Sequence, residues 1–211
     1  MKILTEISEV LINGDSEKTY ELVEEAIKEK NDASDILGNG LLAGMNVISE
    51  RFKNHEIFLP DVLMSAKCMH KGLELLKPLF VGSMIPSKGK VVIGTVQGDL
   101  HDIGKNLVGI MLESAGYEII DLGRDVPPEK YVEAAIENGA IAIGLSALLT
   151  TTMVNMQKVI TILEEKGYKD KIKVIIGGAP VSQEFADLIK ADAYAYDASS
   201  SIDKINELVK N

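Results

Sequence analysis

His101 lies between two carboxylates, Asp99 and Asp102, in a short stretch that also contains Gly98 and Gly104. A neutral imidazole is a good ligand for a transition metal. A nearby carboxylate can accept the other ring N–H, which fixes the tautomer and raises the basicity of the ligating nitrogen. The glycines let the backbone turn sharply and let a bulky group approach. These residue types at this spacing therefore indicate a metal-ligating histidine.

Two other interpretations of this stretch stay open from its residues alone. A single histidine in a loop is often only a polar surface residue, and Asp99 can cap a helix that begins near Ile103. A phosphate-accepting receiver domain also has an aspartate at the end of its first strand. That architecture calls for a further aspartate after the third strand, where this sequence has Gly144-Leu145-Ser146. The receiver interpretation is therefore disfavoured.

The second part of the chain alternates short apolar runs with helical stretches, a pattern typical of a parallel α/β sheet. Strands are predicted at 90–96, 118–122, 140–145, 173–176 and, more weakly, 193–196. Helices are predicted at 103–115, 128–138, 152–166, 181–190 and 199–210. Right-handed crossovers then give a doubly wound, flavodoxin-like, five-stranded parallel sheet. Ligands bind at the carboxyl ends of such strands, and His101 follows the first of them.

The first part of the chain has helical periodicity up to about Phe80. A short first helix ends at Asn13-Gly14, and Asp15 or Ser16 caps the second. A third helix covers roughly 34–52, and a fourth starts at Pro60, a residue suited to a first helical turn. Four amphipathic helices with short connections predict a bundle. Gly, Pro and Ser at 81–90 mark a linker, which predicts domains at 1–88 and 89–211.

Composition excludes several classes of protein. The 211 residues carry a formal net charge of −10, which disfavours nucleic acid and anionic membranes as partners. The single cysteine, Cys68, rules out an intramolecular disulfide and suits a reducing compartment. No segment approaches the roughly 20 apolar residues that a membrane helix needs. We therefore expect a cytoplasmic protein.

Three short elements follow successive predicted strands: Asp99-x-His101-x-x-Gly104, Ser146-x-Leu148 and Gly177-Gly178. Together, and in this order, they resemble the signature of base-off/His-on cobalamin-binding domains. The helical part is similar to the cap module of cobalamin-dependent methionine synthase, a likeness carried by Gly44-Met45, Phe52, Phe58-Leu59-Pro60, Ala66 and Met69. A cap plus a cobalamin domain and little else resembles the stand-alone corrinoid proteins of methylamine and methanol methyltransferase systems.

The resemblance implies a role for each site residue. His101 would displace the nucleotide base of a cobalamin-type corrinoid and ligate cobalt from below, with Asp99 on the distal imidazole nitrogen and Ser146 extending this relay. The remaining implied cofactor contacts in the sheet domain are Gly98, Asp102, Ile103, Gly104, Leu148, Thr150, Gly177, Gly178 and Ala198. In the cap, Phe52, Leu59 and Val62 would cover the upper, methyl-bearing face.

The function that the resemblance implies is methyl transport in the one-carbon metabolism of methanogenesis or acetogenesis. A substrate-specific corrinoid methyltransferase would move a methyl group from a methylamine, methanol, a quaternary amine or a methoxy compound onto Co(I). A second methyltransferase would move it from methyl-Co(III) to coenzyme M or tetrahydrofolate. A reductive activator would serve this non-catalytic subunit.

Two alternatives to methyl transport follow from the same resemblance. The first is a cobalamin-dependent sensor or regulator, although such proteins usually add a DNA-reading helix-turn-helix. The second is the small subunit of an adenosylcobalamin mutase, which generally lacks the Phe58-Leu59-Pro60 cap helix. Neither of the two requires a methyltransferase partner.

Overall fold

The computed structural model describes residues 2–80 and 87–209, and the chain divides into two compact units. The first unit is helical and extends to Ser87, and the second, which contains the sheet, starts at Lys88. Most of the predicted linker, residues 81–86, lies outside the described residues. None of the helices in the described ranges combines the length and apolar character needed to cross a membrane.

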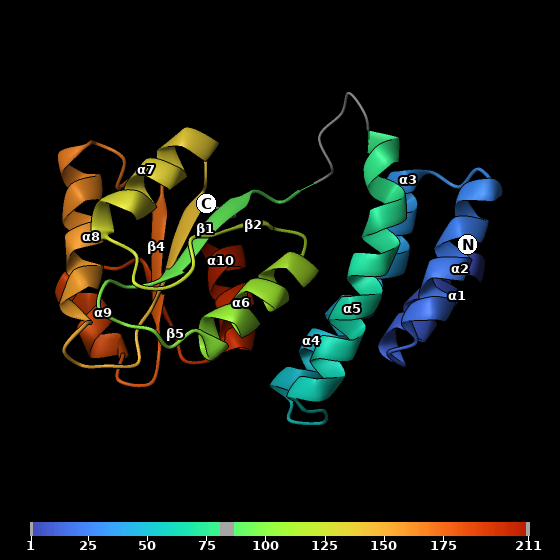
Figure 1. The fold of residues 1–211 in the computed structure, drawn as a ribbon, viewed down its shortest axis with the longest axis horizontal. Helices are drawn as coiled ribbons and strands as arrows, with labels where there is room; N and C mark the ends of the chain where they lie inside the picture. The colour runs from blue at the N-terminus through green and yellow to red at the C-terminus, as the bar shows by residue number, and fades with distance from the viewer. Residues whose placement is uncertain (1, 81–86, 210–211) are drawn as a thin grey trace. The chain divides into compact units, whose positions relative to one another are not determined.

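The helical unit is the predicted bundle (Figure 1). It consists of α1 (Lys2–Ile12), α2 (Ser16–Lys28), a composite third helix, and α5 (Leu59–Leu76), which ends in the 3₁₀ turn η2 (Lys77–Phe80). The third helix runs through α3 (Ala33–Asp35), the π-helix η1 (Ile36–Leu42) and α4 (Ala43–Lys53). Its extent matches the single helix predicted at 34–52, whereas the wider π turns were not predicted.

Local capping and close packing explain why these helices form where they do. The Asp15 carboxylate accepts the backbone N–H of Lys18 at 3.0 Å and begins α2, as predicted. The Asp61 carboxylate accepts the N–H of Phe58 at 2.8 Å at the start of α5. A Cβ on Gly44 would lie 2.9 Å from Leu11 Cδ2. Glycine there lets α4 approach α1 more closely than a larger residue would.

The sheet unit contains five parallel strands in the order β2-β1-β3-β4-β5. The strands are β1 (Lys90–Thr95), β2 (Glu118–Asp121), β3 (Ala142–Ser146), β4 (Lys173–Gly177) and β5 (Ala193–Ala195). The helices of this unit are α6 (Ile103–Ser114), α7 (Pro128–Asn138), α8 (Val154–Glu165), α9 (Gln183–Ile189) and α10 (Ala198–Val209). This is the flavodoxin-like strand order, so the predicted fold is confirmed.

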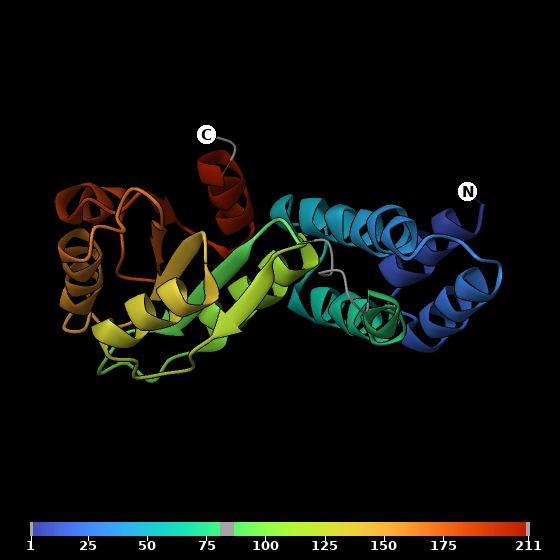
Figure 2. The same ribbon diagram turned by 90° about the horizontal axis from the view of Figure 1, so that it is seen from above.

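Helices cover both faces of the sheet, with α7, α8 and α9 on one face and α6 and α10 on the other (Figures 1 and 2). Most residues of β1, β3 and β4 are therefore buried, and these strands read as nearly continuous apolar runs, whereas the edge strand β2 has exposed ends. Val92, Ile143 and Val174 are fully buried at the centre of three neighbouring strands. The chain leaves β1 for β2 on one side and later returns to β3 on the other. This topological switch point places the loop after β1 beside the loop after β3.

Candidate functional site

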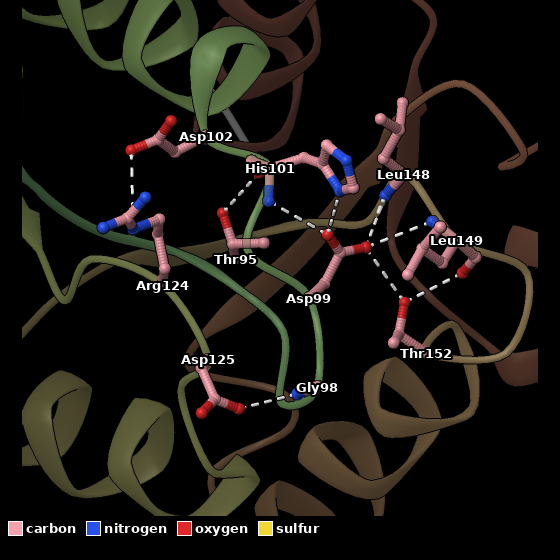
Figure 3. A network of polar contacts seen from close by, with 10 residues as sticks. All are labelled: Thr95, Gly98, Asp99, His101, Asp102, Arg124, Asp125, Leu148, Leu149 and Thr152. Carbon is pink, nitrogen blue, oxygen red and sulfur yellow. Dashed lines mark hydrogen bonds and ion pairs between the residues drawn. The ribbon is translucent and has the colours of Figure 1, made fainter.

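The predicted ligand stretch forms the loop between the end of β1 at Thr95 and the start of α6 at Ile103. Within it the Asp99 side chain is fully buried, whereas 53% of the His101 side chain is exposed. A buried carboxylate thus lies behind an accessible imidazole. Figure 3 shows Asp99 at the centre of a network that joins this loop to the segment after β3.

One carboxylate oxygen of Asp99 orients the imidazole. Asp99 Oδ1 lies 2.8 Å from Nδ1 of His101 and accepts the backbone N–H of the same residue at 3.1 Å. An ionised carboxylate only accepts hydrogen bonds, so the neutral ring carries its proton on Nδ1. The lone pair is then on Nε2, the nitrogen left for an external ligand.

The other carboxylate oxygen of Asp99 is held by the segment after β3. Asp99 Oδ2 accepts the N–H groups of Leu148 at 2.7 Å and Leu149 at 3.1 Å. The Thr152 hydroxyl lies 3.0 Å from the same oxygen and 2.8 Å from the Leu149 carbonyl, so its single proton serves one of the two. These contacts cross from one strand-end loop to the next.

The contacts on Asp99 set its charge state. Burial alone would raise the pKa of this carboxyl. The hydrogen bonds from His101, Leu148 and Leu149 outweigh burial and hold the pKa of Asp99 well below its usual range. The carboxyl is therefore ionised at neutral pH and keeps accepting the His101 N–H.

Further contacts fasten the backbone of the loop. The Thr95 hydroxyl donates to the His101 carbonyl at 3.0 Å, and the Asn155 amide donates to the Gln97 carbonyl at 2.8 Å. The Asp125 carboxylate accepts the N–H of Gly98 at 2.7 Å (Figure 3). The loop is thus held by residues of β1, α8 and the segment after β2.

A cavity of about 330 Å³ lies on the face of the sheet that carries α6 and α10. Its wall is mainly apolar, with Ile93, Val108 and Ile176 among its residues. Five predicted cofactor residues line it: Gly104, Ser146, Gly177, Gly178 and Ala198. The structure therefore brings together residues from strand ends that are far apart in the sequence.

The other predicted residues of the sheet unit lie around the His101 loop or beyond the cavity. Ile103 and Leu148 are exposed next to the His101 loop. The contact between Leu148 and Asp99 is made by the backbone N–H of Leu148. Asp102 faces Arg124, with 3.8 Å between Oδ2 and Nε. Thr150 is exposed in the turn after β3, and it does not line the cavity.

Sequence reasoning missed Thr152 as the hydroxyl next to Asp99. The resemblance implied a relay through Ser146, and Ser146 lines the cavity. Among the described contacts of Asp99, the side-chain hydroxyl group that reaches its carboxylate belongs to Thr152. The turn after β3 brings the chain back toward β1, which places the third threonine of Thr150-Thr151-Thr152 on the carboxylate. The run of three hydroxyl side chains was the available signal, but it did not indicate which one turns inward.

The glycines of the site are required for different reasons. A Cβ on Gly178, whose φ is +126°, would overlap the carbonyl oxygen of Ala147, and one on Gly177 would lie 2.9 Å from the Ala195 carbonyl oxygen. Both residues are thus small because the protein's own backbone surrounds them. A Cβ on Gly104 would meet nothing within 4 Å, although Gly104 lines the cavity. Glycine at that position therefore preserves open space.

The three predicted cap residues differ in exposure. Phe52 in α4 and Leu59 at the start of α5 are half-buried, and Val62 in α5 is fully buried. Partly accessible apolar side chains suit a covering role better than a fully buried one. Their contact with a cofactor stays a prediction.

Comparison with known families gives two matches, one for each unit. Residues 89–202 match a family described as the B12 binding domain. Residues 3–77 match a second family with the same description. The first match spans the strands, the His101 loop and the cavity residues, and the second spans the helical bundle.

Individual proteins resemble the chain over its whole length. A corrinoid protein of Desulfitobacterium hafniense (strain Y51) is 44% identical over 99% of this chain and 98% of its own. Dimethylamine corrinoid protein 1 of Methanosarcina acetivorans is 46% identical, with the same shares covered. The crystal structure of the methanol:cobalamin methyltransferase complex from Methanosarcina barkeri matches with a TM-score of 0.92. It is 33% identical, covering 100% of this chain and 80% of that one.

Proposed function

The chain belongs to the family of B12-binding corrinoid proteins, and on this premise we propose that it carries methyl groups between methyltransferases, with His101 as the lower ligand of its corrinoid cobalt. The observation that carries the proposal is the pairing of buried Asp99 with exposed His101 at 2.8 Å. That pairing leaves Nε2 as the free donor nitrogen. Of the described residues, no group of three or more His, Cys, Asp or Glu side chains is arranged to hold a metal ion directly.

The residues of the sheet unit fit a corrinoid bound in the base-off/His-on form. This form needs an accessible imidazole and a separate place for the displaced nucleotide base. His101 supplies the imidazole, and the cavity beside α6 and α10 supplies space with a mainly apolar wall. Gly104 lines that space, and a Cβ there would meet no other part of the protein within 4 Å outside its own helical turn.

When bound, the corrinoid supplies a cobalt centre that takes up and gives off a methyl group, and the chain's own residues set the lower side of that centre. Asp99 keeps the proton on Nδ1 of His101, which makes Nε2 a better donor. Nε2 would be the atom that holds the cobalt, and where that nitrogen carries a proton instead, the ionised Asp99 carboxylate would stabilise the charged ring. Leu148, Leu149 and Thr152 hold the carboxylate in place.

The partners that we propose follow from the names of the relatives. Several are called dimethylamine or trimethylamine corrinoid proteins, and one solved structure is a complex with a methanol:cobalamin methyltransferase. A methylamine methyltransferase is therefore the first candidate donor enzyme, with methanol, quaternary amines and methoxy compounds as other substrates. The acceptor enzyme would use coenzyme M or tetrahydrofolate, and a reductive activator would restore the lowest cobalt oxidation state.

Methyl transfer to the reduced protein tests this function. The chain is reconstituted with hydroxocobalamin, desalted, reduced with titanium(III) citrate, and mixed with purified dimethylamine, trimethylamine, monomethylamine or methanol corrinoid methyltransferase and the matching substrate. We expect one pair to give the visible spectral change of corrinoid methylation at catalytic enzyme concentration. His101→Ala serves as the matched variant. Failure of the wild-type protein to retain corrinoid, or to be methylated by any pair, would contradict the proposal.

A further inference from the structure

Asp125 has a left-handed backbone conformation at a position that is not the end of a helix. Among the non-glycine residues that the structure describes, positive φ occurs at Lys30, His55, Asp125 and Lys190. Lys30, His55 and Lys190 lie at the ends of α2, α4 and α9, where a left-handed residue commonly terminates a helix. Asp125, with a φ of 54°, instead lies in the connection between β2 and α7. Helix termination does not explain it.

Core packing does not explain this conformation either, because Asp125 is exposed. Its neighbour Val126 is buried and extends the sheet, since its N–H donates to the Thr95 carbonyl at 3.0 Å and it bridges to Val96. The segment is thus anchored along the end of β1. A left-handed conformation is unfavourable for a residue with a Cβ atom, so the contacts of Asp125 have to offset that cost.

Among the residues that the structure describes, two polar contacts of Asp125 go to the His101 loop. Asp125 Oδ1 accepts the N–H of Gly98 at 2.7 Å (Figure 3), and the Asp125 N–H donates to the Asp99 carbonyl at 3.1 Å. These two bonds hold the peptide group that precedes Gly98 and the peptide group that follows Asp99. The backbone from which the Asp99 carboxylate reaches His101 is thereby fixed to the segment after β2.

We propose that Asp125 is a positioning residue for the lower ligand, and that its carboxylate holds the loop in the conformation that presents Nε2 of His101 to cobalt. The inference rests on the proposed function, because it concerns ligation by His101. Asp125 acts on the imidazole through its bonds to Gly98 and Asp99. Without its carboxylate the loop has more conformations, and a smaller share of them aligns the imidazole.

Three variants separate positioning from a general effect on folding. Asp125→Gly keeps the left-handed conformation but removes the acceptor for Gly98 N–H. Asp125→Asn keeps both the conformation and an acceptor oxygen, and it is the rescue variant. Lys190→Gly is the matched control, because it replaces another left-handed residue with glycine at the end of α9. Asp125→Ala, which also removes the acceptor, replaces the glycine variant should the latter fail to fold.

The first readout uses the corrinoid-free protein. Hydrogen exchange of the Gly98 amide, followed by NMR, reports the bond to Asp125 directly. We expect exchange roughly three- to tenfold faster in Asp125→Gly, the loss expected for one hydrogen bond to a charged but exposed group. The Asp125→Asn variant should preserve most of the protection, and Lys190→Gly should match the wild type.

The second readout is ligation by His101 in the cobalamin-loaded Co(II) state. The nitrogen splitting of the electron paramagnetic resonance signal is recorded against pH, since protonation of the imidazole competes with ligation. Ligation weakened three- to tenfold moves the midpoint of its loss upward by roughly half to one pH unit. We expect this shift in Asp125→Gly, little shift in Asp125→Asn and none in Lys190→Gly.

The two proposals fail in different ways. If wild-type protein shows no nitrogen splitting, or if labelling its histidines with ¹⁵N leaves the splitting unchanged, the proposed function is wrong. If His101 passes that test but Asp125→Gly, or its alanine replacement, leaves the pH midpoint unchanged, the positioning role alone is overturned. Equal shifts in Asp125→Gly and Lys190→Gly would also overturn it, because the effect would then follow from glycine at any left-handed position.

Discussion

The loop after β1 and the loop after β4 both start at the carboxyl edge of the sheet, but different kinds of contact determine their conformations. After β1, side chains define the structure, with the buried Asp99 carboxylate accepting bonds from His101 and from the segment after β3. After β4, the loop conformation depends on residues without side chains, because Gly177 and Gly178 lie against backbone carbonyl groups that leave no room for a Cβ atom. Placing a ligand nitrogen takes directional bonds, whereas leaving room beside it takes small residues.

Gly178→Ala should have the largest effect on folding and would test the steric half of this comparison. The new Cβ would overlap the Ala147 carbonyl oxygen, and φ at +126° is unfavourable for alanine. We expect the free energy of unfolding to fall by about 3–5 kcal/mol, the sum of strain and overpacking. Denaturant unfolding of the corrinoid-free protein measures it. Gly167→Ala is the control, because its φ of +73° is also positive but its Cβ meets nothing within 4 Å. Equal losses in the two variants would break the steric argument.

Asp99→Asn tests the polar half of the comparison. The amide oxygen of asparagine can accept from only one set of N–H groups, either that of His101 or that of Leu148. Its NH₂ group then faces the other set and is a buried donor without an acceptor. We expect a loss of about 2–3 kcal/mol in the free energy of unfolding near neutral pH. A loss no larger than that of an exposed Asp→Asn control such as Asp187→Asn would show that the network contributes little to stability.

The pH dependence of this loss has a definite sign. The pKa of Asp99 is lowered in the folded chain, so its contribution to stability is present above its unfolded pKa of about 4. The contribution is lost as the pH falls below that value toward the folded pKa. The difference in unfolding free energy between wild type and Asp99→Asn should therefore be smaller at about pH 3 than at about pH 6. A difference that grew on acidification would contradict the ionised state of Asp99.

A smaller effect separates the two hydroxyl groups. Thr152→Val keeps the shape of the side chain and removes the hydroxyl next to Asp99, so it should cost about 0.5–1.5 kcal/mol. Ser146→Ala removes a hydroxyl from a residue of the cavity wall and should change stability by less than about 0.5 kcal/mol. Unfolding of the corrinoid-free variants gives both values. A larger loss of stability in Ser146→Ala than in Thr152→Val would indicate that Ser146, rather than Thr152, supplies the hydroxyl group of the relay.

Gly104→Ala should change stability least and cofactor binding most. The new Cβ meets no protein atom within 4 Å, and glycine is unfavourable inside a helix such as α6. Stability should be unchanged or higher by up to about 1 kcal/mol. Corrinoid retained after desalting should fall, because the methyl group is added to a residue of the cavity wall. Undiminished retention would indicate that the cavity does not receive the cofactor.

The sequence predicted those features that depend on local order. Apolar runs and turns located the strands, and the carboxyl end of the first one located His101. Asp99 and His101 are two positions apart, so their contact is visible in the sequence. The alternation of strands and helices was sufficient to predict the fold, whereas the binding of a ligand by this loop stays a prediction.

The sequence did not predict contacts made across the fold. Thr152 is 53 positions from Asp99, and Asp125 is 27 positions from Gly98. Neither periodicity nor composition tells which loop residue turns toward a distant carboxylate or amide. The π-helix at Ile36–Leu42 is similar, because wide turns depend on packing against other helices rather than on residue propensity.

The most direct test of the central claim is the Co(II) electron paramagnetic resonance spectrum of cobalamin-loaded protein in which only histidine carries ¹⁵N. Ligation by His101 predicts that the nitrogen splitting changes from the triplet of natural nitrogen to a doublet, and that His101→Ala abolishes the doublet. A triplet that persists in the labelled protein would mean that the corrinoid keeps its own base, and His101 would not be the ligand.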